Sequence, residues 1–138
     1  SDIHAAIGLN QMSRLDKYVS RRHEIAECYD TEFKNLSLVT PWQAPNVYSS
    51  YHLYPVLIKN NFNNKSQRQV YDELIKNNIA ANLHYTPVHR HPYYENLGFK
   101  KNDFPVAEKF HQEAISIPMF AMLKNEDQKY VIETLKKR

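Results

Sequence analysis

Apolar residues recur in steps of three and four along the first quarter of the chain. No proline interrupts residues 2–35, and Asp2 is placed to cap a helix at its start. The spacing predicts one long amphipathic helix over residues 2–35, with two ordinary helices and a break between them as the alternative. The apolar positions of this pattern are Met12, Leu15, Val19, Ala26, Tyr29 and Phe33.

The rest of the chain alternates between short strand patterns and helix patterns. Aromatic and β-branched residues predict strands over residues 48–58, 79–84 and 115–117, with a turn at residues 60–64. Pro55 places the first of these strands at a sheet edge or a bulge. Capping residues predict three helices, which begin at Ser66 (paired with Gln69), at Pro105 and at Asn125 (paired with Gln128). The order predicts an α+β domain with a small sheet covered by helices.

Composition excludes several classes of site. The 138 residues include two glycines, Gly8 and Gly98, which are too few and too isolated for a phosphate-binding glycine loop. The net charge of +3 is mixed in sign along the chain, so we expect no nucleic-acid partner. No apolar run approaches the length of a membrane span, and the single cysteine fits a reducing compartment. We therefore expect a cytoplasmic protein with no membrane partner.

The segment from residue 82 to residue 94 carries the densest candidate chemistry. Three histidines, His84, His89 and His91, stand there beside Arg90 and several tyrosines, just after a predicted strand. Three imidazoles could bind a metal ion, although no cysteine or aspartate accompanies them. The same residues could instead pack among the tyrosines of a polar loop. We favour a third interpretation, an anion- or sugar-binding loop, because Arg, His and Tyr suit phosphates and hydroxyls.

Several motifs together resemble the DegT/StrS-type nucleotide-sugar aminotransferases, and they cover nearly the whole chain. Within that family, the sequence of residues 82–89 most resembles the corresponding segment in the enzymes of pseudaminic acid biosynthesis. Those enzymes aminate C4 of a UDP-linked 4-keto-6-deoxy-N-acetylhexosamine. The matching motifs are residues 2–16 with Arg21 and Arg22, residues 51–54, residues 82–89, residues 92–94, residues 104–108 and residues 115–118.

This resemblance implies the small antiparallel domain of a fold-type I aminotransferase that uses pyridoxal phosphate, glutamate as amino donor and a homodimer as working unit. Residues 1–35 correspond to the linker helix and residues 36–138 to the small C-terminal domain. The lysine that carries the cofactor lies upstream in the family, so we expect no catalytic residue and no bound cofactor in this segment alone, and no transamination by it.

The resemblance also assigns substrate recognition to the loop after the second predicted strand. It implies that His84, Tyr85 and His89 line the sugar-nucleotide pocket and that Arg90 meets the diphosphate. One alternative from another class stays open, a non-catalytic homologue that dimerises and binds a nucleotide-sugar or a partner protein. An RNA-binding module is a further alternative, but no RNA-binding signature accompanies it.

Overall fold

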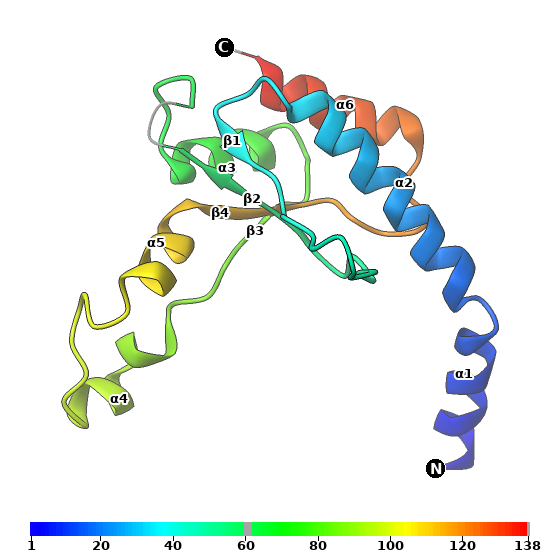
Figure 1. The fold of residues 1–138 in the computed structure, drawn as a ribbon, viewed down its shortest axis with the longest axis horizontal. Helices are drawn as coiled ribbons and strands as arrows, with labels where there is room; N and C mark the ends of the chain where they lie inside the picture. The colour runs from blue at the N-terminus through cyan, green and yellow to red at the C-terminus, as the bar shows by residue number, and fades with distance from the viewer. Residues whose placement is uncertain (60–61, 138) are drawn as a thin grey trace.

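The computed structural model describes residues 1–59 and 62–137, and Figure 1 shows their arrangement. The described part is an α+β domain with a small antiparallel sheet, as the sequence predicts. In chain order, the elements are α1 (Asp2–Met12), α2 (Leu15–Phe33), β1 (Leu38–Val39), β2 (Tyr54–Ile58), α3 (Gln67–Lys76), β3 (Asn82–Leu83), the 3-10 turn η1 (Val88–Arg90), α4 (Pro92–Asn96), α5 (Pro105–Glu113), β4 (Ala114–Ile117) and α6 (Asn125–Lys136).

The sheet has the strand order β1-β2-β4-β3, with every neighbouring pair antiparallel. The last strand in sequence, β4, therefore lies between β2 and β3. Its register pairs Tyr54 with Ile117 on one side and Leu83 with Ile115 on the other. All four residues of β4 are buried, as expected for an inner strand that is covered on both faces.

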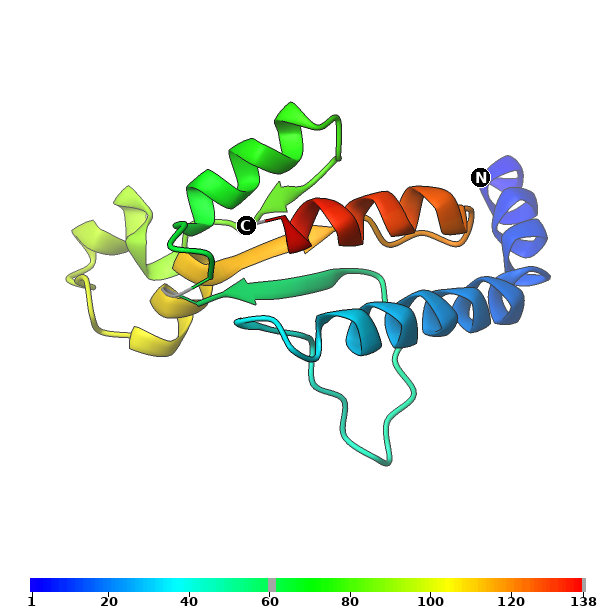
Figure 2. The same ribbon diagram turned by 90° about the horizontal axis from the view of Figure 1, so that it is seen from above.

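Helices α2, α6 and α3 form a layer over one face of the sheet (Figures 1 and 2). Alternate residues of β2 point into the core, where Tyr54, Val56 and Ile58 are at most 2% exposed. From α2, the rings of Tyr29 and Phe33 pack parallel with centroids 5.4 Å apart. Burial of these large side chains is the main stabilisation of the domain.

The single long helix expected over residues 2–35 is divided into α1 and α2. At the junction, the Ser13 hydroxyl donates to the Asn10 carbonyl oxygen at 2.8 Å, and the Arg14 N–H donates to the Gln11 carbonyl oxygen at 3.0 Å. A serine that bonds to the preceding turn competes with the helical pattern, which accounts for the break. The cap predicted at Asp2 is wrong, because the first helix begins at Asp2 with Ser1 as its cap. None of the residues of this helix is buried. Figure 1 shows α1 projecting away from the sheet.

The first two predicted strands are shorter than the sequence pattern predicts, the third extends over Ala114–Ile117, and β1 was not predicted. Residues 48–53 form an irregular approach to β2, and the second strand is reduced to Asn82–Leu83. Pro55 belongs to an inner strand, but β1 pairs only with Leu57 and Ile58. At Pro55 the sheet therefore has one neighbour, β4, so the proline sits at a local edge.

The three helices predicted to begin near Ser66, Pro105 and Asn125 are present, and two of the three capping predictions are confirmed. The Ser66 hydroxyl accepts from the Gln69 N–H, and the Gln69 side chain accepts from the Ser66 N–H, which completes a capping box. Pro105 occupies the first turn of α5. The cap predicted at Asn125 is wrong, because Lys124 is the cap residue and the Gln128 amide donates across the core to the Ile25 carbonyl oxygen.

The long segment from residue 85 to residue 103 is partly helical, with η1 and α4 within it. Of the predicted turn at residues 60–64, residues 60 and 61 lie outside the described part. Asn63 and Asn64 of that turn have φ angles of 50° and 56°, which asparagine tolerates in turns. Within residues 1–59 and 62–137, no helix is long and apolar enough to cross a membrane.

Candidate functional site

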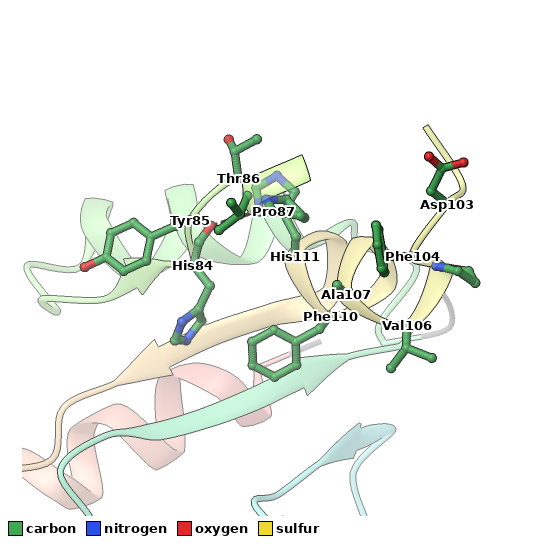
Figure 3. A pocket seen from close by; sticks show the side chains of 12 residues that line it. His84, Tyr85, Thr86, Pro87, Asp103, Phe104, Val106, Ala107, Phe110 and His111 are labelled. Carbon is green, nitrogen blue, oxygen red and sulfur yellow. Dashed lines mark hydrogen bonds between the residues drawn. The ribbon is translucent and has the colours of Figure 1, made fainter. Parts of the chain in front are cut away.

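A hollow of about 800 Å³ lies between the segment that follows β3 and α5 with the two residues before it (Figure 3). Its walls are mostly apolar, with a few polar groups among them, which is the usual character of a small-molecule site. The lining residues are His84, Tyr85, Thr86, Pro87, Val88, Asp103, Phe104, Pro105, Val106, Ala107, Phe110 and His111.

Two hydrogen bonds of His84 and one contact of its ring fix the end of β3 in this hollow. The ring Nε2 lies 2.9 Å from the Ser116 hydroxyl oxygen in β4, and the backbone carbonyl oxygen of His84 accepts from Nδ1 of His111 at 2.9 Å. The imidazole also packs against the ring of Phe110, with centroids 5.3 Å apart. Desolvation by burial lowers the pKa of His84, so the neutral form is favoured there.

Tyr85 is the most exposed aromatic residue of the lining. Its side chain is 90% exposed, whereas the His84 ring beside it is half-buried. Both residues lie just beyond β3, and Figure 3 shows their side chains pointing in different directions. The phenol is free to contact a ligand at the mouth of the hollow.

The opposite wall, contributed by α5, was not among the residues singled out from the sequence. Phe104, Val106 and Phe110 are all at least 41% exposed, which is unusual for three large apolar side chains so close together. Spacing along the helix could have indicated the wall, because residue 107 follows residue 104 by three, and residues 110 and 111 follow residue 107 by three and four. The pairing of this face with the segment after β3 depends on tertiary structure.

The other two predicted site residues lie outside the lining. His89 is buried at 7% exposure, and its Nε2 donates to Oε1 of Glu108 at 2.8 Å. Its ring also packs against Phe104, with centroids 4.8 Å apart. The hydrogen bond from His89 is the largest cause that lowers the pKa of Glu108, against the opposing effect of desolvation. Arg90 donates from Nε to Oε1 of Glu95 at 2.7 Å.

The three histidines of this segment contact three different partners and do not converge. His84 faces Ser116, His89 faces Glu108, and Nε2 of His91 donates to the Thr86 carbonyl oxygen at 3.2 Å. Among the described residues, no group of three or more His, Cys, Asp or Glu side chains could hold a metal ion. The geometry therefore does not support the metal interpretation of this segment.

The lining of the hollow also does not fit pyridoxal phosphate on its own. Its twelve residues include no lysine to carry the aldehyde carbon of the cofactor, and no arginine for the phosphate. Asp103 is the carboxylate of the lining, and it stands with the apolar residues that open α5. What the hollow offers is a mainly apolar surface with hydroxyl and imidazole groups.

Comparison with known proteins gives the chain a context. Residues 1–136 match the model of the DegT/DnrJ/EryC1/StrS aminotransferase family. The spore coat polysaccharide biosynthesis protein SpsC of Bacillus subtilis is 33% identical over 98% of the chain and 36% of that protein. The UDP-4-amino-4,6-dideoxy-N-acetyl-β-L-altrosamine transaminase of Campylobacter jejuni is 32% identical over 98% of the chain and 36% of that protein.

Solved structures are similar to the chain in fold as well as in sequence. The apo form of Spr1654 from Streptococcus pneumoniae superposes with a TM-score of 0.88 and 33% identity over 99% of the chain and 34% of that structure. Helicobacter pylori PseC, an aminotransferase of pseudaminic acid biosynthesis, gives a TM-score of 0.85 and 29% identity over 96% of the chain and 36% of that structure.

The chain thus spans about a third of the length of the relatives that it matches. The match runs through the long helical segment, the sheet and both walls of the hollow. The chain belongs to the DegT/DnrJ/EryC1/StrS aminotransferase family, whose members are pyridoxal-phosphate-dependent sugar aminotransferases.

Proposed function

We propose that this chain is the substrate-recognising C-terminal part of a nucleotide-sugar aminotransferase. The observation that carries the proposal is the hollow beside β3, which is built from the segment that resembles the family's sugar-binding loop, from α5 and from the two residues before α5. In this assignment, residues 1–35 are the helical link and residues 36–138 the small domain. The cofactor-binding domain, with the lysine that carries pyridoxal phosphate, belongs to the rest of a longer protein.

The substrate of the whole enzyme, in this proposal, is a UDP-linked 4-keto-6-deoxy-N-acetylhexosamine, with glutamate as amino donor and a homodimer as the active unit. Two relatives named as UDP-sugar transaminases and the PseC structure support that choice. Bound pyridoxal phosphate supplies the electron sink for transfer of the amino group. The free thiol of Cys28 is consistent with the reducing cytoplasm that the proposal includes.

The recognition loop has two kinds of residue in this proposal. His84 and Tyr85 contact the sugar, since both line the hollow, and the apolar wall of α5 accommodates the 6-methyl or N-acetyl methyl group. His89 acts from beneath by holding the loop against Glu108. Arg90, whose Nε is engaged by Glu95, directs its remaining N–H groups to the diphosphate.

Steady-state kinetics of the full-length enzyme test this proposal. With the UDP-4-keto sugar and glutamate, we expect formation of the amino sugar and 2-oxoglutarate. Tyr85→Ala is expected to raise KM for the sugar nucleotide by about fivefold or more, which corresponds to loss of one good contact. The thermal midpoint is expected to be unchanged, because Tyr85 is 90% exposed.

Tyr93→Ala is the matched control, since Tyr93 is 69% exposed on α4 and lies outside the hollow. We expect this variant to keep the wild-type KM. Unchanged KM and kcat in Tyr85→Ala would refute the assignment of the sugar site. Absence of amino transfer to any UDP-linked 4-keto sugar would refute the proposed substrate.

A further inference from the structure

A second hollow, of about 590 Å³, lies at the opposite edge of the sheet from the one beside β3. It is formed where the end of α2 meets β1 and the irregular segment that follows β1. Polar groups line it as well as apolar ones, and they are Asp30, Lys34, Thr40, Trp42, Gln43 and Tyr51. The proposed aminotransferase function uses none of these residues.

Trp42 is the single tryptophan of the chain, and it is 82% exposed at the rim of this hollow. Such exposure leaves a large apolar ring in water, at a cost that a bound ligand would remove. Pro41 precedes it and limits the freedom of the backbone at this point. The indole is thus presented on a stiffened segment and not on a flexible one.

Gln43, the next residue but one after Pro41, has an amide oxygen that lacks a hydrogen-bond partner. Its Oε1 is buried, and no donor reaches it among the residues that the structure describes. A buried acceptor without a donor is uncommon in folded proteins, because it has lost its bond to water without replacement. Rotation of the Gln43 side chain toward the hollow would expose this oxygen, and a ligand hydroxyl there would then supply the missing donor.

Asp30 adds a second acceptor to the same hollow. Its Oδ1 accepts from the Tyr54 hydroxyl at 2.6 Å, and its Oδ2 makes no hydrogen bond with the described residues. Tyr51, which also lines the hollow, has a φ of 44°, a left-handed conformation that is unfavourable for a bulky residue. Its N–H donates to the Ser49 hydroxyl oxygen at 3.1 Å, which helps to hold that conformation. Strained residues of this kind concentrate at binding sites.

We propose that this hollow binds a neutral pyranose sugar, with the C–H face of the ring on Trp42 and ring hydroxyls donating to Gln43 and Asp30. The acceptors decide the class of ligand. A phosphate would face the Asp30 carboxylate with Lys34 as the nearby cation of the lining, whereas an uncharged polyol has the donors that both acceptors need. The proposal is independent of the proposed aminotransferase function.

Fluorine NMR of the full-length protein labelled with 5-fluorotryptophan tests the site directly. The Trp42 resonance is identified by its absence in Trp42→Phe, and the probes are N-acetylglucosamine and, separately, uridine. We expect a saturable shift with N-acetylglucosamine and a Kd of about 1–10 mM, in the range of a weak single-ring ligand. No shift at ~50 mM sugar, or a saturable shift with uridine alone, would overturn the proposal.

Variants separate a binding role from a structural one. Ligand-observed NMR should show binding weakened about tenfold in Trp42→Ala and by less than about threefold in Trp42→Phe, which keeps an aromatic face. Gln43→Leu should weaken binding about fivefold while leaving the thermal midpoint equal or higher, because it removes an unsatisfied buried group. Wild-type affinity in either Trp42→Ala or Gln43→Leu would contradict the site. Tyr93→Ala is the control and should bind as the wild type does.

Discussion

His89 donates from Nε2 to Oε1 of Glu108 across 2.8 Å, and both side chains are buried. The same carboxylate oxygen accepts from the Asn102 N–H at 2.6 Å. One oxygen therefore joins the 3-10 turn η1, the bend before α5 and α5 itself. Both walls of the hollow beside β3 depend on this junction, because Phe104 packs on the His89 ring.

Loss of the His89 side chain is expected to destabilise the domain. In His89→Ala, Glu108 loses a hydrogen-bond donor while it stays buried, and we expect the free energy of unfolding to fall by about 2 kcal/mol. Urea denaturation at neutral pH measures it. His91→Ala serves as the control, since His91 is exposed and its bond to Thr86 is longer, at 3.2 Å. Equal stability of the two variants would show that the buried contact has no stabilising effect.

Acidic pH should lower the free energy of unfolding of the domain by protonating Glu108. Its pKa lies below the ordinary 4.5, first because His89 donates to the carboxylate, and desolvation opposes this only in part. The unfolded chain therefore takes up the proton at higher pH than the folded chain does. The stabilisation is complete above about pH 4.5 and is lost as the pH falls through the folded pKa.

Glu108→Gln cannot ionise, so this variant lacks the pH-dependent stabilisation that the Glu108 carboxylate provides. Urea midpoints measured from pH 7 down to pH 3 should fall less steeply for the variant than for the wild type at the acid end. Glu126→Gln is the control, because Glu126 is exposed and its loss should leave the profile parallel to the wild type. Parallel profiles for Glu108→Gln would contradict the assigned role.

The buried phenol of Tyr54 should stabilise the folded domain through one hydrogen bond to α2. Its hydroxyl donates to Oδ1 of Asp30 at 2.6 Å, and burial is the first cause that raises its pKa. Tyr54→Phe keeps the packing and removes the donor, so we expect a loss of about 1 kcal/mol in the free energy of unfolding. Tyr85→Phe, at a 90% exposed position, should cost nothing measurable by the same denaturation experiment.

The capping box of α3 gives a prediction that concerns local structure. Ser66→Ala removes the acceptor for the Gln69 N–H, and we expect a loss of about 1 kcal/mol, with earlier amide exchange in the first turn of α3. Ser20→Ala, at an exposed position inside α2, should be neutral or slightly stabilising. A cost at Ser20 equal to that at Ser66 would argue against the cap.

Local signals account for what the sequence could predict. Ser66 with Gln69 and Pro105 mark helix starts by their own chemistry, and both starts are confirmed. Gln128 carries the same local signal, but its amide is used by the Ile25 carbonyl oxygen about a hundred residues away in the chain. A pattern within four residues cannot reveal that choice.

In the candidate site, too, some residues could be predicted from local sequence and others could not. The histidine segment could be identified from composition, and His84 and Tyr85 line the hollow. The inward position of His89 could not be predicted, because its partner Glu108 lies on a different element. The α5 wall was missed for the same reason, since Phe104 and Phe110 define a hollow only once β3 and β4 are paired.

The position of β4 in the sheet has a consequence for folding. Tyr54 in β2 pairs with Ile117 in β4, so this pairing cannot form before residue 117 has been synthesised. In the described sheet, β3 pairs with β4 alone. During synthesis, the earlier strands leave the ribosome without the strand that joins them, and such long-range pairing is slow. The segment up to α5 is thus exposed to misassociation until the last fifth of this sequence has emerged, and chaperones have that interval in which to act.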